Sequence, residues 1–549
     1  MKKANFMEGA FIATVAIFLV KVLGVLYIIP FYSMVGIQGS ILYGYAYSIY
    51  VIFLSLSTRG ITLAISRIIS EYNALEQYHL KEKVYRLASG LIISLGLILF
   101  LILIIFAPQI AYLILGDLEG GNTIADVTLV VRLIATALLI VPLLAVTKGY
   151  LQGHQFIYPT SIAHLLEQFF RVLVIVVGGF IAINILGYSV EIGVGIAVIG
   201  ATVGAFIAYL YLYYKMQKNR NSLLRDKEIT RQEAGVSSKE LIKKIILYAM
   251  PFILIDILKS GFNLIDTFTV VRTMVNLGSA EIAELTVGII TNLGSKLNMI
   301  ITSIAVGITI SLVPNIAASY AKGNFKDINL KINQTLQVIL FIGLPMTVGL
   351  YFLIQPTWVL FYSYDEVSIS IYQVYLFQAI IFAVFSVLIK TLQVMDNTKF
   401  ALGSLLIIFL LKIVLNVPLM HLFSIFNFPL YYAPILLTLT LYLIAIIFML
   451  IYFQKKYQFS FVSQYQRYIK IVIITIMMLI ILRIGNLFIP IEATTKGRAL
   501  LEIFVFTFVG SVSYFFITYR SGLLQEIFGI HFVKKIIKKL RSEFVFSKK

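Results

Sequence analysis

The chain has 549 residues, of which 60% are hydrophobic and 13% are charged, whereas about 25% are charged in a soluble globular protein. This composition excludes an ordinary soluble domain and predicts an all-α polytopic membrane protein. Cysteine is absent, which excludes disulfides and thiolate metal sites. The formal net charge of +19 would suggest a nucleic-acid partner in a soluble protein, but here the basic residues must first be assigned to the two sides of a membrane.

Fourteen apolar segments are predicted to be transmembrane helices, because about 20 apolar residues cross the hydrocarbon layer. The first is interpreted as a retained helix rather than a signal peptide, since it is long and contains Lys21. The segments are residues 7–35, 42–70, 84–116, 125–150, 158–184, 190–214, 243–276, 285–319, 328–360, 369–392, 399–424, 429–453, 466–490 and 499–519.

The distribution of lysine and arginine predicts the orientation of the chain. An even number of helices places both termini on one side of the membrane. If that side is cytoplasmic, inner loops and ends carry 32 of the 44 Lys and Arg residues and outer ends carry four. Because cytoplasmic loops are enriched in these residues, we predict cytoplasmic termini. The basic inner surface would then attract anionic membrane lipids rather than nucleic acid.

A weak internal repeat divides the first twelve segments into two halves. Pro108 and Pro356 lie 248 residues apart near the ends of segments three and nine, as do Tyr72 and Tyr320 after segments two and eight. Since each half has an even number of helices, the halves insert in the same orientation, which predicts two parallel six-helix lobes around a cavity. The predicted parts are an N-terminal lobe (1–214), a cytoplasmic linker (215–242), a C-terminal lobe (243–456), two extra helices (457–520) and a basic amphipathic cytoplasmic tail (521–549).

Pairing along one helix decides which intramembrane charges are available to a ligand. Glu167 and Arg171 are four residues apart, and Asp256 and Lys259 are three apart, so each pair can be neutralised on one helix face. A charge at the centre of a membrane helix is costly and normally faces a bundle interior or a wet cavity. The charges that remain predict an electropositive cavity; they are Asp266, Lys21, Arg59, Lys296 and Lys412.

Each of these charges also has a structural interpretation. Lys21 could form a salt bridge with a carboxylate such as Asp266. Arg59 follows a polar run that could mark a helix kink, where a guanidinium would cap freed carbonyl groups. Lys296, in a polar patch of segment eight, and Lys412 could likewise stabilise the bundle without touching a ligand.

Nothing in the sequence resembles a catalytic or nucleotide-binding constellation, so we expect no enzyme activity and no cofactor. There is no Walker loop, no zinc-binding HExxH motif and no nucleotide domain. His154 and His421 are interpreted as structural, Trp358 as an anchor at the membrane interface, and Arg67 and Arg483 as side chains that extend to a membrane boundary. Transport energy would come from ion, voltage or substrate gradients.

A basic cavity between two lobes suits a bulky anionic substrate, because guanidinium and ammonium groups bind phosphate strongly. A lipid-linked diphosphate meets this description. Its head needs the basic cavity, and its tail needs an apolar path.

Four stretches carry a resemblance to a known family. They are FLVKVLG around Lys21, RGITLAISRIISEY from Arg59, GSKLNMIITSIAVGITISLVPNIA around Lys296, and KGYLQGHQ before Pro159-Thr160. With them the chain resembles the MurJ-type lipid II flippases and the stage V sporulation protein B group of the MOP (multidrug/oligosaccharidyl-lipid/polysaccharide) exporter superfamily. The likeness extends over essentially the whole chain. One difference lies late in the first segment. Some family members have a second basic residue there, whereas this chain has Leu26-Tyr27-Ile28.

The resemblance implies a fourteen-helix, two-lobed flippase of a bacterial cytoplasmic membrane, acting as a monomer by alternating access. Its substrate would be lipid II, the peptidoglycan precursor linked to undecaprenyl diphosphate, and segments thirteen and fourteen would form a groove for the lipid tail. Lys21, Arg59 and Lys296 would converge on the diphosphate.

Some members of the family bind sodium between helices seven, eleven and twelve. Here Asp256, Asn416 and Thr438 would correspond, but Lys412 lies where a neutral ligand is expected. A lysine ammonium could replace the sodium ion. We therefore expect no metal, an ion pair between Asp256 and Lys412, and Asp266 as a further candidate for coupling.

Three other functions are alternatives to a lipid II flippase. An exporter of another lipid-linked polysaccharide would belong to the same superfamily and have the same basic cavity. It stays an alternative because no motif in this sequence identifies the sugar. A multidrug cation antiporter of the same fold needs carboxylates in its cavity. A membrane glycosyltransferase or ligase needs acidic catalytic residues on substantial outer loops, which the predicted topology lacks.

Overall fold

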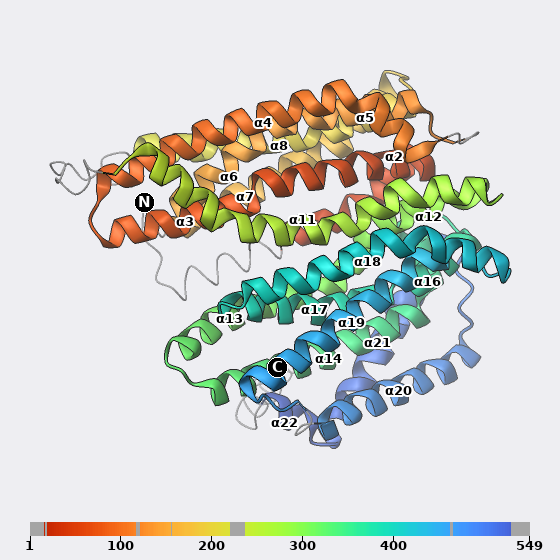
Figure 1. The fold of residues 1–549 in the computed structure, drawn as a ribbon. Coiled ribbons are helices and arrows are strands. Elements are labelled where there is room, and N and C mark those ends of the chain that lie inside the picture. Colours follow the sequence, from red (N-terminus) through yellow and green to blue (C-terminus); the bar gives the residue numbers. More distant parts are fainter. Residues whose placement is uncertain are drawn as a thin grey trace, which may run out of the picture. The chain divides into compact units, whose positions relative to one another are not determined.

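A computed structural model describes residues 16, 19–116, 121–154, 156–219, 236–461 and 465–528. All regular secondary structure in these ranges is helical (Figure 1). The start of the first predicted segment, most of the predicted linker and most of the predicted amphipathic tail lie outside the described residues.

Glycine and a polar run separate the first elements. The chain is helical from residue 19 and continues into α2 (Ile28–Ser57), which is interrupted at Gly36. Gly36 adopts a φ of 65°, a conformation that glycine tolerates because it has no Cβ. A second interruption at Thr58 separates α2 from α3 (Arg59–Ala74). The first interruption lies between the first two predicted segments, and the second lies at the polar run that was interpreted as a possible kink.

The remaining helices follow the predicted apolar segments closely. They are α4 (Tyr78–Leu115), α5 (Ile124–Ala135), α6 (Ala137–Gly153), α7 (Ile157–Leu173), the π-helical turns η1 (Val174–Gly178) and η2 (Ile181–Ile185), α8 (Val190–Lys218), α11 (Ser238–Asn276), α12 (Ala280–Gly288), the π-helical turn η3 (Ile289–Leu293), α13 (Gly294–Ala321), α14 (Phe325–Phe352), α15 (Ile354–Phe361), α16 (Glu366–Tyr375), α17 (Phe377–Val394), α18 (Thr398–Ile425), α19 (Tyr432–Tyr457), α20 (Tyr465–Phe488), α21 (Lys496–Arg520) and α22 (Leu523–Phe528).

Eleven helical stretches among the described residues are long and apolar enough to cross a membrane. Their surfaces expose large apolar side chains, such as Phe488 (81% exposed) and Phe504 (70% exposed). Such surfaces are stable against lipid tails but not against water. The structure thus supports a polytopic, all-helical membrane protein.

Local sequence accounts for where several helices begin. Thr123 and Ser237 precede α5 and α11, and each forms a reciprocal capping box, with Asp126 and Glu240 respectively. In a capping box the two side chains satisfy backbone N–H groups that lack partners in the first helical turn. These two helices therefore have starts that the sequence specifies.

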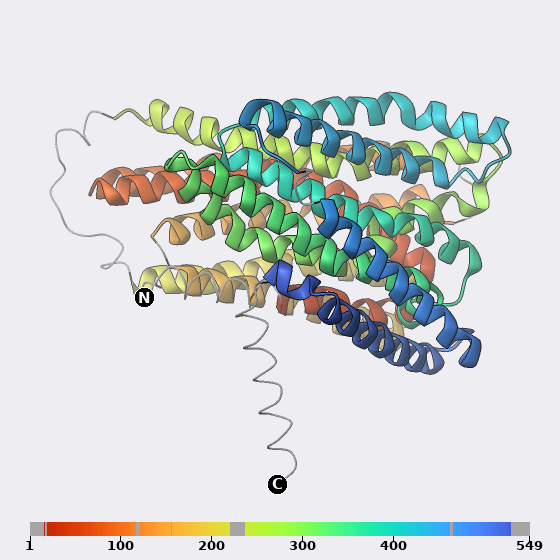
Figure 2. The same cartoon turned by 90° about the horizontal axis from the view of Figure 1, so that it is seen from below.

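The chain divides into two compact units. The first contains residues 1–299 and 398–441, where α11 packs on α2, α3 and α18 and where α4 packs on α5 and α6 (Figure 1). The second contains residues 300–397 and 442–549, where α20 packs on α21 and on α14 (Figure 2). This division rests on contacts within the chain, and the predicted two-lobe repeat over 1–214 and 243–456 stays a prediction.

Trp358 corrects one expectation from the sequence. Its side chain is 1% exposed, and its ring centroid lies 4.6 Å from that of Tyr362 and 5.4 Å from that of Tyr372. Trp358 therefore belongs to an aromatic core of the second unit and is not a membrane-interface anchor. The prediction was wrong because position near a helix end does not reveal which neighbours cover a side chain.

Candidate substrate-binding and coupling sites

Lys296 lies on α13 between two aromatic rings of the first unit. Its Nζ is 5.5 Å from the ring centroid of Tyr27 and 5.7 Å from that of Tyr47. Ring faces attract a cation through their quadrupole without cancelling its charge. None of the salt bridges found among the described residues involves Lys296. Tyr27 lies in the stretch where the sequence departs from some family members, but nothing in the sequence indicated that its ring contacts Lys296.

Lys21 lies half-buried on the helix that contacts α13. A β-carbon placed on Gly24 would be 3.5 Å from both Met299 Cε and Gln168 Nε2, so this helix lies against α13 and α7. Gly24 is opposite Met299 and Tyr27 is opposite Lys296, so the two helices run antiparallel. Six residues separate Lys21 from Tyr27, or about 9 Å along the axis at 1.5 Å per residue. Lys21 is therefore about two helical turns from the level of Lys296.

Arg59 is the first residue of α3, which packs closely on α11. A β-carbon on the next residue, Gly60, would lie 2.8 Å from the Ala249 carbonyl oxygen and 2.9 Å from the Ile253 nitrogen. Asp256 is one turn beyond Ile253 on α11 and thus near the level of Arg59. Twelve residues separate Arg59 from Tyr47, so its level differs from that of Lys296 by about 18 Å along the helix.

The register therefore places the three predicted substrate-binding cations at successive levels. Lys296 is at one end, Lys21 is about 9 Å further along, and Arg59 is about another 9 Å beyond. All three belong to the first unit. The expectation that the three side chains converge on one diphosphate stays a prediction.

Four of the five predicted coupling residues meet in one buried cluster. Lys412 on α18 is fully buried, and its Nζ lies 2.7 Å from Asp266 Oδ1 on α11. The ammonium also donates to the Pro434 carbonyl oxygen (2.8 Å) and to Thr438 Oγ1 (2.9 Å), both on α19. Asn416 Nδ2 donates to Asp266 Oδ1 (3.1 Å) and to Thr269 Oγ1 (2.7 Å).

The expected ion pair of Lys412 with Asp256 is wrong, because Asp266 is the partner. The two carboxylates are ten residues apart on α11, almost three helical turns, so only one of them can lie beside α18 at this level. Asp266, which was considered as a partner of Lys21, pairs with Lys412. The Pro434 carbonyl was not anticipated, since a backbone oxygen carries no sequence signal.

The predicted pair of Glu167 and Arg171 is confirmed and is part of a larger network. Arg171 Nη2 donates to Glu167 Oε1 at 3.1 Å, and Lys148 Nζ donates to Glu167 Oε2 at 2.7 Å. Lys148 lies within α6. The count of lysine and arginine residues had instead placed it at the cytoplasmic end of that segment. The carboxylate of Glu167 is thus shared between two cations, and the three side chains together keep a net charge of +1.

The contact of α2 with α12 and η3 joins residues from the two sequence halves. Glu284 accepts from the Tyr45 hydroxyl and, through its two oxygens, from the side-chain amide and backbone N–H of Asn122, each at 3.1 Å. Asn292 Nδ2 donates to the Ser40 carbonyl oxygen at 2.8 Å. Glycines allow a close approach here, since a β-carbon on Gly44 would lie 3.0 Å from Asn292 Cβ.

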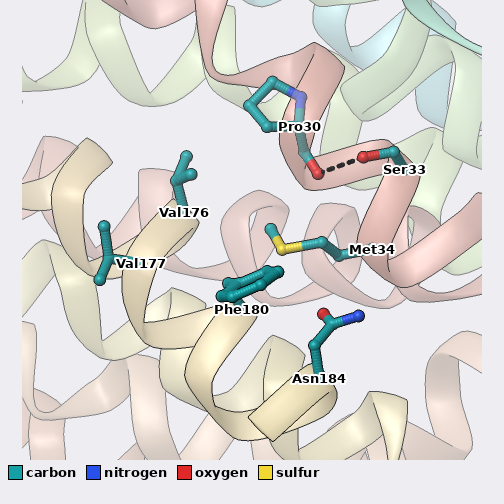
Figure 3. A pocket seen from close by; sticks show the side chains of 7 residues that line it. All are labelled: Pro30, Ser33, Met34, Val176, Val177, Phe180 and Asn184. Carbon is teal, nitrogen blue, oxygen red and sulfur yellow. Dashed lines mark hydrogen bonds between the residues drawn. The ribbon is translucent and has the colours of Figure 1, made fainter.

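Figure 3 shows a pocket beside α2 with a volume of about 350 Å³. Ser33 Oγ donates to the Pro30 carbonyl oxygen at its rim. The wall is mostly apolar and includes none of the predicted site residues; it consists of Pro30, Ser33, Met34, Val176, Val177, Phe180 and Asn184. This pocket is therefore separate from the cation sites.

A bundle of long apolar helices defines a polytopic membrane protein, and charged side chains within such helices are typical of transporters. The comparisons with known proteins agree. Residues 6–320 match the family described as polysaccharide biosynthesis protein, and residues 251–417 match the family described as MatE. The chain is 31% identical over 541 residues to the lipid II flippase MurJ of Bacillus subtilis (strain 168), which covers 96% of this chain and 97% of that one. It is 22% identical over 344 residues to stage V sporulation protein B of the same organism, covering 62% of this chain and 64% of that one.

Solved structures show the same fold. A structure of lipid II flippase MurJ in an inward closed conformation matches with a TM-score of 0.65 at 17% identity, over 93% of this chain and 99% of that one. An inward-facing multidrug resistance MATE family transporter of the MOP superfamily matches with a TM-score of 0.64 at 16% identity, over 81% of this chain and 98% of that one. The chain therefore belongs to the polysaccharide biosynthesis protein family and to the family of the lipid II flippase MurJ.

Proposed function

We propose that this protein is a flippase that carries lipid II from the inner to the outer leaflet of a bacterial cytoplasmic membrane. The observation that carries the proposal is the likeness to the flippase MurJ over almost the whole of both chains. Lys21, Arg59 and Lys296 fit the chemistry, because ammonium and guanidinium groups bind a diphosphate strongly. The protein would act as a transporter without enzyme activity or cofactor, as a monomer, and with no nucleic-acid partner.

The topology we propose has fourteen membrane helices with both termini in the cytoplasm. Besides the eleven qualifying stretches, it requires that the first segment, α11 and the run from α12 to α13 also cross. At 1.5 Å per residue, α11 with its 39 residues is about 58 Å long, which exceeds the roughly 30 Å hydrocarbon layer. The 32-to-4 distribution of Lys and Arg supports the orientation.

Two parallel lobes would alternate between inward and outward access, with α20 and α21 providing an apolar path for the lipid tail. Several large apolar side chains project from these two helices and remain exposed; they are Leu487, Phe488, Leu501, Phe504 and Phe508. An exposed apolar surface of this kind suits a long isoprenoid chain.

The substrate diphosphate would pass along Arg59, Lys21 and Lys296 in succession. Their levels differ by about 9 Å per step, and an extended lysine or arginine side chain can bridge most of such a step. A negative interior opposes outward movement of an anion by about 2.3 kcal/mol per charge per 100 mV, and cations along the path reduce this cost.

Coupling to an energy source would involve the cluster of Asp266, Lys412, Asn416 and Thr438. Asp256, at the level of Arg59, would accompany the substrate path instead. Sodium is not expected to drive transport, because a cation already occupies the cluster.

Depletion of the protein in its native cell tests the function. Lipid II should accumulate in the inner leaflet, and re-expression should clear it. Accumulation of a different lipid-linked saccharide, with normal lipid II, would favour the second candidate, an exporter of another polysaccharide precursor, which the family description also supports. Normal levels of both would refute the proposal.

A further inference from the structure

The ammonium of Lys412 lies in a cage of oxygen atoms from two other helices. Asp266 Oδ1, the Pro434 carbonyl oxygen and Thr438 Oγ1 lie 2.7, 2.8 and 2.9 Å from Nζ. These three contacts use all three protons of the ammonium group. The side chain is fully buried, so the contacts are shielded from water.

The cage has the composition of a site for a hard monovalent cation. A carboxylate, a peptide carbonyl and a hydroxyl are oxygen donors of the kind that bind alkali and alkaline-earth ions. Asn416 also belongs to this cluster, because its Nδ2 donates to Asp266 Oδ1 at 3.1 Å. Three oxygens with one negative charge thus surround the space that the ammonium fills.

A free sodium ion does not fit this site, although the fold family implies one between the corresponding helices. The ammonium takes the central position and its charge balances Asp266. A second cation there would meet a like charge within a few ångströms in a region shielded from water, which is strongly unfavourable. The residues of this cluster therefore do not fit a sodium site.

We propose that Lys412 is a tethered cation: its ammonium permanently replaces an exchangeable alkali ion and holds α11, α18 and α19 together. The tether prevents exchange with solution, so the protein has no requirement for sodium. The cage itself remains competent for an inorganic ion, and removing the tether without filling its volume exposes that capacity. This inference concerns the cation and does not rest on the identity of the transported lipid.

The test measures the melting temperature and sodium-22 binding of the purified full-length protein, in sodium, ammonium or choline chloride at constant ionic strength. The wild type should melt at the same temperature in all three salts and bind no sodium. Lys412→Ala should melt several degrees lower in choline, recover saturably in sodium or ammonium, and bind one sodium ion per molecule.

Two matched variants distinguish ion binding by the cage from a general loss of stability. Lys412→Met removes the charge but fills the volume, and Lys412→Ala with Asp266→Asn opens the volume but removes the carboxylate. Neither should respond to sodium. A saturable response of the wild type to sodium would overturn the proposal without any variant. A Lys412→Ala protein that ignores both sodium and ammonium, or responds equally when Asp266 is replaced, would also overturn it.

Discussion

The close contact between α2 and α12 allows a direct test of alternating access. A β-carbon on Gly288 would lie 3.4 Å from Cβ of Ile41, close to the mean of about 3.8 Å in disulfides. All the nearest atoms to that position belong to Ile41, so replacing Ile41 by cysteine removes the crowding. Since the natural chain has no cysteine, the double variant Ile41→Cys/Gly288→Cys contains only the two thiols of interest.

The bonds that normally close this contact are weak enough to break in each cycle. The hydrogen bonds from Tyr45, Asn122 and Asn292 number four, and at about 1 kcal/mol each they oppose separation by about 4 kcal/mol, a factor of about 10³. Thermal motion overcomes such a cost within a transport cycle. A disulfide instead holds the two Cα atoms within about 7 Å, so we expect oxidation to reduce transport by at least about tenfold.

The assay reconstitutes the double variant in vesicles and follows movement of labelled lipid II between leaflets, with oxidant and then with reductant. Transport should stop on oxidation and return on reduction, while each single-cysteine variant should be unaffected. The pair Val174→Cys/Gly200→Cys serves as a matched control, because its Cβ separation is also 3.4 Å but both residues belong to the first sequence half. A β-carbon on Gly200 would approach the Arg171 carbonyl oxygen at 2.9 Å, so expression of this pair is compared first. Native transport by a fully cross-linked Ile41–Gly288 variant would refute the reasoning.

Three further results are expected. A cysteine placed between Asn219 and Gly235 should resist a membrane-impermeant thiol reagent added from outside, and labelling there would contradict cytoplasmic termini. Lys21→Ala and Lys296→Ala should each abolish complementation at normal protein level, whereas Lys21→Arg should retain it; growth supported by both alanine variants would exclude a role in substrate binding. Glu167→Gln should lower the free energy of unfolding by about 3 kcal/mol, because it leaves Lys148 and Arg171 buried without their carboxylate, and an unchanged thermal melt would show that the network contributes little.

Hydropathy was sufficient to place the helices, because a membrane helix needs only a long apolar run and satisfies its backbone internally. The interruptions at Gly36 and Thr58 were also visible, as a glycine between two segments and a polar run inside one. The inward position of Trp358 was not visible, since burial depends on which helices pack nearby.

Charge pairing was predicted only where both partners lie on one helix. Residues three or four apart share a face, so Glu167 and Arg171 could be paired from spacing alone. Lys412 and Asp266 are 146 residues apart, and choosing Asp266 over Asp256 requires the packing of α11 on α18. Lys148 was missed for the same reason, because its partner lies on α7 while Lys148 lies on α6.

Lys296 and Lys412 show why an electropositive site cannot be inferred from the number of intramembrane cations. Both are lysines in apolar segments, yet Lys412 is neutralised by Asp266 and Lys296 lies over the rings of Tyr27 and Tyr47. A carboxylate cancels the charge, whereas ring faces lower the cost of burying the ammonium while leaving its net charge in place. We therefore expect an incoming diphosphate to be attracted to Lys296 but not to Lys412. The environment that the folded chain builds around each lysine thus uses Lys412 to hold helices together, and it is the reason we propose Lys296, not Lys412, as the substrate ligand.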